Sequence, residues 1–135
     1  MNAQAQTLQR LDPHLIYVVD GLTSLAMGIA LLFTAAPLTD LAGWAMPASF
    51  LWIVGLLLLP WAAYNAWIAR TTRPARAVVA ANIIGDIAWV VGTATLVAIH
   101  ASDLTSLGLA LLAGQGIAVS GVLLLKLFGR PALVG

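Results

Sequence analysis

Apolar residues fill four long segments of the chain, and short polar stretches separate these segments. They cover about residues 15–36, 48–69, 75–99 and 104–128. Each contains at least about 20 residues, and a helix of that length crosses roughly 30 Å of hydrocarbon. The segments do not alternate apolar with polar residues, as strands of a membrane barrel do. The pattern therefore predicts an all-α, polytopic membrane protein with four transmembrane helices.

Capping residues and prolines predict where the helices begin and end. Asp12 lies just before the first apolar segment and is a suitable N-cap, and we expect Pro37 to end that helix. For the fourth helix we expect the N-cap at Ser102 or Asp103. Its end is expected before the Gly–Arg–Pro stretch at residues 129–131.

Composition agrees with a membrane protein. The chain has 135 residues, of which 61% are hydrophobic and 8% charged, whereas a soluble domain carries about 25% charged residues. We therefore expect a single domain, residues 1–135, with the lipid bilayer as its surroundings. The net charge of +1 gives no indication of a nucleic-acid partner. There is no cysteine, which excludes disulfides and thiolate chemistry.

The basic residues predict the orientation of the helices. In a four-helix arrangement they all fall on one side, and the opposite loops contain Asp40 and Asp103 but no Lys or Arg. Basic loops face the cytoplasm. We therefore expect an antiparallel bundle in a bacterial inner membrane, with both termini cytoplasmic (N-in, C-in). The first apolar segment is too long for a cleaved signal peptide. The basic residues are Arg10, Arg70, Arg73, Arg76, Lys126 and Arg130.

Polar residues within each segment recur at helical spacing, so each helix has one polar face. Lipid cannot provide hydrogen bonds to these groups, so the polar faces should point into the bundle. They carry the candidate ligand-binding residues Asp20, Trp61, Asn65, Asn82, Asp86, Trp89 and Gln115.

Depth along the helices predicts a polar pocket in the cytoplasmic half. Asp20, Asn65 and Asn82 should form one layer, with Asp86 and Gln115 beneath it. Lys126 lies near the predicted boundary, from which its ammonium can reach toward Asp20.

Asp86 is expected to have no cation at its own depth. It is therefore a candidate central carboxylate, either ionised or protonated and donating a hydrogen bond to Gln115 or to a carbonyl oxygen.

Structural roles are the alternative for each candidate. In this interpretation Asp20 merely forms an ion pair that holds two helices together. The amides form interhelical hydrogen bonds worth about 0.6 kcal/mol each. Trp61 and Trp89 can line a ligand site or simply pack in the core. His14 and His100 are predicted at opposite membrane faces, where they cannot share a metal. We expect no metal site and no cofactor.

These residues favour binding or transport of a small polar or cationic solute, with proton coupling as an option. The alternative is a non-catalytic accessory or assembly subunit of a larger membrane complex. Gly116 and Ser120 form a small-xxx-small pattern on the fourth helix, which suits packing within the bundle, a homo-oligomer or a larger complex. An enzyme acting on lipid is a third reading, for which the sequence offers no set of catalytic residues.

The order of features resembles small four-helix inner-membrane proteins of bacteria, in particular the DoxX-like group. An apolar helix up to Pro37 is followed by the outer segment 41–47, and the second helix contains Gly55. The third helix has Asn82 followed by Trp89, and the fourth contains Gln115. The resemblance implies the four-helix fold and a bacterial membrane location, and it carries over no catalytic residue. This chain lacks the charged residue expected early in the second helix of that group.

Overall fold

The computed structural model describes residue 3 and residues 12–134; Arg10, used in the predicted orientation, lies outside them. The described chain contains four long helices, and each is long and apolar enough to cross a membrane. The prediction of an all-helical, multi-pass membrane protein is confirmed to that extent. The helices are α2 (Pro13–Ala42), α3 (Ala48–Arg70), α4 (Arg76–His100) and α5 (Ser106–Val134).

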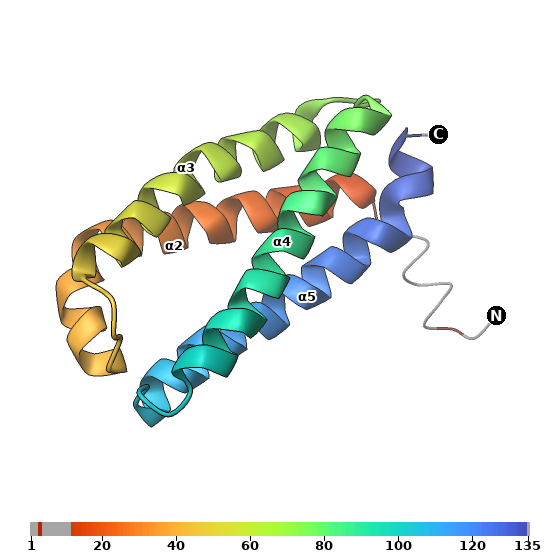
Figure 1. The fold of residues 1–135 in the computed structure, drawn as a ribbon. Helices are drawn as coiled ribbons and strands as arrows, with labels where there is room; N and C mark the ends of the chain where they lie inside the picture. Colours follow the sequence, from red (N-terminus) through yellow and green to blue (C-terminus); the bar gives the residue numbers. More distant parts are fainter. Residues whose placement is uncertain (1–2, 4–11, 135) are drawn as a thin grey trace.

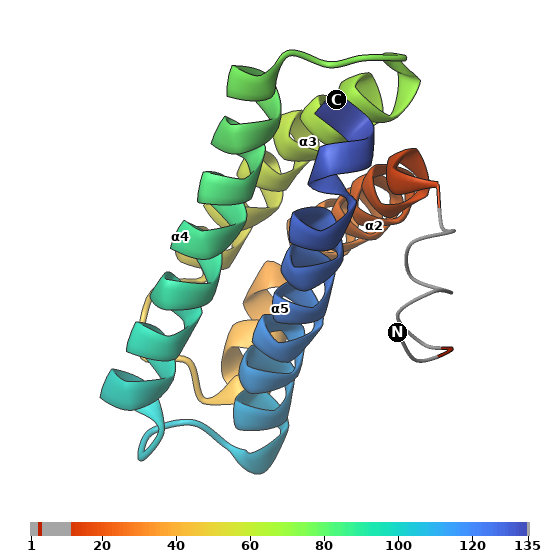
Figure 2. The same ribbon diagram turned by 90° about the vertical axis from the view of Figure 1, so that its right-hand side faces the viewer.

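The helices pack as two pairs. Helix α2 lies along α3, α4 lies along α5, and α2 also contacts α5, whereas the backbones of α3 and α4 approach each other at few positions. Figures 1 and 2 show that α3 and α4 meet near the loop that joins them and diverge toward their other ends. We call this end the basic end, because Arg70 at the end of α3, Arg73 in the loop and Arg76 at the start of α4 lie there. The opposite end holds the α2–α3 and α4–α5 loops.

Asp12 caps α2 as predicted. Its side chain accepts a hydrogen bond from the His14 backbone N–H at 2.9 Å, and Pro13 occupies the first turn. The backbone and side-chain hydrogen bonds from His14 lower the pKa of the Asp12 carboxyl. The His14 ring also lies 2.8 Å from the carbonyl oxygen of Thr71, which links the start of α2 to the end of α3.

The prediction that Pro37 ends the first helix is wrong. Helix α2 continues through Pro37 to Ala42, and it bends near this end in Figure 1. It stops at Gly43, which has a φ of 66° and donates its N–H to the carbonyl oxygens of Thr39 and Asp40. A residue in this left-handed conformation ends a helix, and glycine adopts it without steric cost. Residues 37–42 are therefore helical, and they include the first two residues of the outer segment 41–47.

The predicted limits of the fourth helix are also wrong. The helix begins after Thr105, whose hydroxyl accepts a hydrogen bond from the Gly108 N–H at 3.1 Å, so neither Ser102 nor Asp103 is its cap. It then runs through residues 129–131 to Val134. Tertiary packing explains the extension, because Leu133 is only 2% exposed in the apolar core.

That apolar core lies at the basic end. It joins residues from all four helices, which packs the two helix pairs together there. Gly129 contributes by lacking a side chain, since a Cβ at this position would lie 3.1 Å from the Cβ of Pro13. The buried core residues are Ile16, Tyr17, Ile68, Val79, Ile83 and Leu133.

Two close backbone contacts set the remaining packing. Gly28 and Gly55 face each other between α2 and α3, and a Cβ on either would lie 2.9 Å from the other's carbonyl oxygen. At the opposite end, Thr105 donates its N–H to the carbonyl oxygen of Ala42 and its hydroxyl to that of Leu41. The two helix pairs are thus joined at both ends and separate between them.

Candidate functional site

A buried lysine lies at the centre of the polar side chains. Lys126 Nζ of α5 is 2.6 Å from Asp20 Oδ2 of α2 and 2.6 Å from Asp86 Oδ2 of α4. It also lies 2.8 Å from Asn82 Oδ1 and 3.1 Å from Asn65 Oδ1. We call these five residues the lysine cluster. It contains at least one side chain from each of the four helices.

The cluster is almost completely shielded from solvent. Asn65 and Asn82 have no exposed surface, Lys126 is 1% exposed, Asp86 2% and Asp20 8%. The predicted inward orientation of these polar faces is therefore confirmed. Charges this deep in a membrane protein are costly unless they pair with one another. The four contacts of Lys126 Nζ provide that pairing.

The expectation that Lys126 reaches Asp20 is confirmed, but the expectation that Asp86 has no cation at its depth is wrong. Because α5 continues to Val134, Lys126 lies eight residues before the helix end, roughly 12 Å along the axis. The lysine is therefore well inside the bundle, and its four-carbon stem brings Nζ between the two carboxylates.

Aromatic rings complete the surroundings of the ammonium group. Nζ lies 4.9 Å from the ring centroid of Tyr17 and 5.6 Å from that of Trp61, within the range of cation–π attraction. Trp61 packs over Gly85, where a Cβ would lie only 2.6 Å from the indole. Tyr17 is 1% exposed, and its hydroxyl has no hydrogen-bond partner within the described part of the chain.

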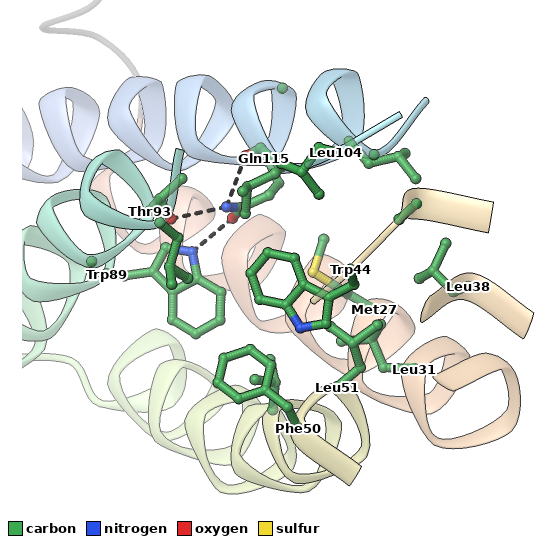
Figure 3. Close-up of a pocket in the computed structure, with 18 of the residues that line it drawn as sticks. Met27, Leu31, Leu38, Trp44, Phe50, Leu51, Trp89, Thr93, Leu104 and Gln115 are labelled. Carbon is green, nitrogen blue, oxygen red and sulfur yellow. Dashed lines mark hydrogen bonds between the residues drawn. The ribbon is translucent and has the colours of Figure 1, made fainter. Parts of the chain in front are cut away.

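A separate cavity of about 770 Å³ lies toward the opposite end, between the diverging helix pairs. Most of its lining is apolar, as Figure 3 shows. Polar groups are concentrated on one wall, where Trp89 Nε1 donates to Gln115 Oε1 at 2.7 Å. Gln115 Nε2 in turn donates to Thr93 Oγ1 at 2.9 Å and to the carbonyl oxygen of Leu112 at 3.0 Å.

Trp44, which follows the end of α2, lines the same cavity. Its ring packs against Phe50 and His100, with centroid distances of 5.5 and 5.2 Å. The Trp44 Nε1–H is buried and finds no acceptor among the described residues. The sequence analysis missed Trp44, because it lies between two helices in the outer segment 41–47, where helical periodicity indicates no orientation.

The structure thus divides the predicted site residues into two groups. Five of them, Asp20, Trp61, Asn65, Asn82 and Asp86, surround Lys126. The other two, Trp89 and Gln115, line the cavity.

Gln115 therefore does not form the floor of the carboxylate layer, and its hydrogen bonds go to Trp89, Thr93 and Leu112 instead of Asp86. The predicted pocket at the carboxylates is filled by Lys126, and the open volume lies elsewhere.

Other sequence predictions concern contacts of the helices. Gly116 is buried against Thr93, where a Cβ would lie 2.7 Å from the threonine methyl carbon, and the Ser120 hydroxyl donates to the Gly116 carbonyl oxygen. Gly116 is therefore used within the chain, and association through this helix stays a prediction. His14 beside Thr71 and His100 beside Trp44 lie at opposite ends of the bundle, as expected.

Two features can thus carry function: a sealed charge cluster and an apolar cavity with a polar wall. Comparison with family models, curated proteins and solved structures gives no match for this chain, so the DoxX-like resemblance stays an expectation.

Proposed function

We propose that this membrane protein binds a small, neutral and largely apolar solute in the cavity between its two helix pairs. The observation that carries the proposal is the cavity itself, whose volume of about 770 Å³ lies in the range of small-molecule sites. Such sites combine an apolar lining with a few convergent polar groups. Trp44, Trp89, Thr93 and Gln115 supply those groups here.

The hydrogen-bonding capacity of the wall favours a solute with an acceptor. The Gln115 amide already uses its N–H groups on Thr93 and Leu112, and the Trp89 N–H is used on Gln115. The Trp44 N–H has no partner in the described structure. This N–H is buried and does not open onto the cavity, so a carbonyl or ether oxygen of the solute would satisfy it only once the Trp44 ring turned toward the cavity. The apolar part of the solute would contact the aliphatic lining.

Lys126 is the reason to favour a neutral solute over a cationic one. A cation bound by Asp20 and Asp86 would have to displace Nζ from two contacts of 2.6 Å. It would also have to enter a region where none of the five polar residues is more than 8% exposed. Binding in the cavity needs neither change.

The proposal includes the predicted topology: an antiparallel bundle in a bacterial inner membrane, with the basic end in the cytoplasm. Arginines at residues 70, 73 and 76 lie at that end, whereas the other end has Asp40 in the last turn of α2 and Asp103 in the α4–α5 loop, without Lys or Arg. Basic loops favour the cytoplasmic side. In this orientation the cavity lies in the half of the membrane away from the cytoplasm.

Photolabelling with benzophenone tests the binding site. Benzophenone is neutral, aromatic and carries one carbonyl acceptor, and ultraviolet light attaches it to nearby C–H groups. The purified protein in detergent is labelled at increasing probe concentrations, and the modified residues are mapped by mass spectrometry. We expect saturable labelling of cavity residues such as Met27, Leu31 and Leu112.

Two glycines provide matched variants. Gly92 lines the cavity and Gly121 lies outside it, and a Cβ at either position would meet no atom within 4 Å. Gly92→Leu should fill part of the cavity and reduce the saturable labelling at least about fivefold, about the effect of losing 1 kcal/mol of affinity. Gly121→Leu should leave it unchanged. Non-saturable labelling spread over outward-facing residues, equal in both variants, would refute the proposal.

A further inference from the structure

The lysine cluster contains unequal numbers of opposite charges. Two carboxylates, Asp20 and Asp86, face one ammonium group, Lys126 Nζ. If both acids were ionised, one negative charge would remain unbalanced in the interior of four membrane-spanning helices. Such a charge is strongly disfavoured where water is excluded.

No other cation is placed to balance it among the described residues that face the cluster. Helix α2 contributes Asp20 and Tyr17, α4 contributes Asp86, and α5 contributes Lys126, with Arg130 exposed to solvent one turn further on. Helix α3 contributes amide and aromatic groups, and the hydroxyl of its Tyr64 donates to the carbonyl oxygen of Val78.

We propose that the lysine cluster is a proton-binding site that holds one exchangeable proton in addition to the lysine ammonium, and that Asp86 carries this proton. The bound form is neutral overall, with one carboxylate, one carboxylic acid and one ammonium. Release of the proton breaks the O–H bond of Asp86, leaves its electron pair on the carboxylate and transfers H⁺ to water. This proton site is distinct from the solute cavity and does not depend on the proposed function.

The contacts of the two acids favour Asp86 as the carrier. Asp20 accepts hydrogen bonds at both oxygens, from Lys126 Nζ at Oδ2 and from the Ser24 hydroxyl at Oδ1. Donors at both oxygens stabilise the ionised form. The Asp20 side chain is also 11% exposed, against 3% for Asp86. A proton on Asp86 Oδ1 leaves Oδ2 free to accept the bond from Lys126.

The ammonium group supports the same count. It has three N–H donors, whereas four oxygens lie within 3.1 Å of Nζ. The cluster is therefore rich in acceptors and poor in donors. One further proton supplies a donor and reduces the charge to zero.

Infrared spectroscopy can count this proton because the chain contains few carboxyl groups. It has no glutamate, and its remaining aspartates, Asp12, Asp40 and Asp103, are exposed to solvent, whereas the two acids of the cluster are buried. Any carboxylic acid C=O stretch at pH 7 then belongs to the cluster. The purified full-length chain is measured in an ester-free detergent such as dodecyl maltoside, in H₂O and in D₂O, where exchange shifts the band.

The charge balance predicts a separate count for each variant. The natural sequence should show one protonated carboxyl group per chain. Asp86→Asn and Asp20→Asn should each show none, because each leaves one carboxylate paired with one ammonium. Lys126→Met should show two, because neither acid then has a cation. Asp40→Asn, which removes an exposed acid, is the control and should not change the band.

Circular dichroism identifies variants that fail to fold. If Lys126→Met unfolds, the natural chain and the two aspartate variants still decide the question. Absence of a carboxylic acid band in the natural chain at pH 7 would overturn the proposal. Retention of the full band in Asp86→Asn would overturn both the charge balance and the placement of the proton on Asp86.

Discussion

Replacing Lys126 with methionine is the sharpest test of how this bundle is held together. Methionine keeps most of the length of the side chain and removes its charge. In the structure the ammonium group contacts two carboxylates and two amide oxygens, with only 1% of the residue exposed. The substitution therefore leaves four buried oxygens without their shared donor.

The expected loss is large for a single substitution. Removing one partner of a buried ion pair costs about 3–5 kcal/mol, because the other charge stays buried without compensation. Protonation of the freed acids limits the cost of the lost ion pairs, so we expect this part of the loss in unfolding free energy to lie near the lower end of the range, at about 3 kcal/mol. The two amide oxygens add losses of about 1 kcal/mol each where no new donor replaces Nζ.

The free energy of unfolding is measured by titrating the protein in mixed micelles with sodium dodecyl sulfate and following circular dichroism. The matched control combines Lys126→Met with Asp20→Asn and Asp86→Asn, which removes all three charges. It should recover most of the loss, because uncharged replacements of a buried ion triad are often neutral in stability. A loss below about 1 kcal/mol for Lys126→Met, the value of an exposed ion pair, would refute the reasoning.

Two further predictions concern the packing and the first cap. Gly28→Ala should destabilise the fold by about 1–3 kcal/mol in the same titration, because its Cβ would lie 2.9 Å from the Gly55 carbonyl oxygen, whereas Gly121→Ala, with open space around it, should change stability little; equal effects would contradict the packing argument. Because hydrogen bonds from His14 lower the pKa of Asp12, the carboxylate's stabilisation of the α2 start is complete above the ordinary aspartate pKa and is lost as the pH falls through the lowered value. The hydrogen-exchange rate of the His14 amide, divided by the intrinsic rate of an unprotected amide at the same pH, should rise only in that acidic range. It should show no such rise in Asp12→Asn. A rise already at neutral pH would contradict this assignment.

The sequence by itself determined the helices and the faces that they bury. Apolar segments of more than 20 residues leave few folds other than membrane-spanning helices, because backbone groups in lipid must bond within their own segment. The same constraint turns Asp20, Asn65, Asn82 and Asp86 inward, and all four are buried. These predictions rest on periodicity, which acts over a few turns and is visible in the chain itself.

Only the tertiary structure decided where the helices end and which polar groups meet. Pro37 and Pro131 are helix-ending residues in isolation, yet α2 and α5 continue through them, and burial of Leu133 in a core from four helices accounts for the second case. Because α5 extends to Val134, Lys126 lies about 12 Å from the end of the helix and not next to it. It thereby changes Asp86 from a carboxylate without a partner into one of two acids that share a cation.

The position of the cavity was likewise beyond the sequence. It exists because α3 and α4 diverge from their common loop while both pairs stay joined at the two ends, and no local pattern encodes the angle between helix pairs. Local periodicity placed Gln115 and Trp89 on inward faces but could not tell which layer of the bundle each would reach. Depth depends on helix register, and register is set by contacts between residues far apart in the chain, such as Gly28 with Gly55 and Thr105 with Ala42.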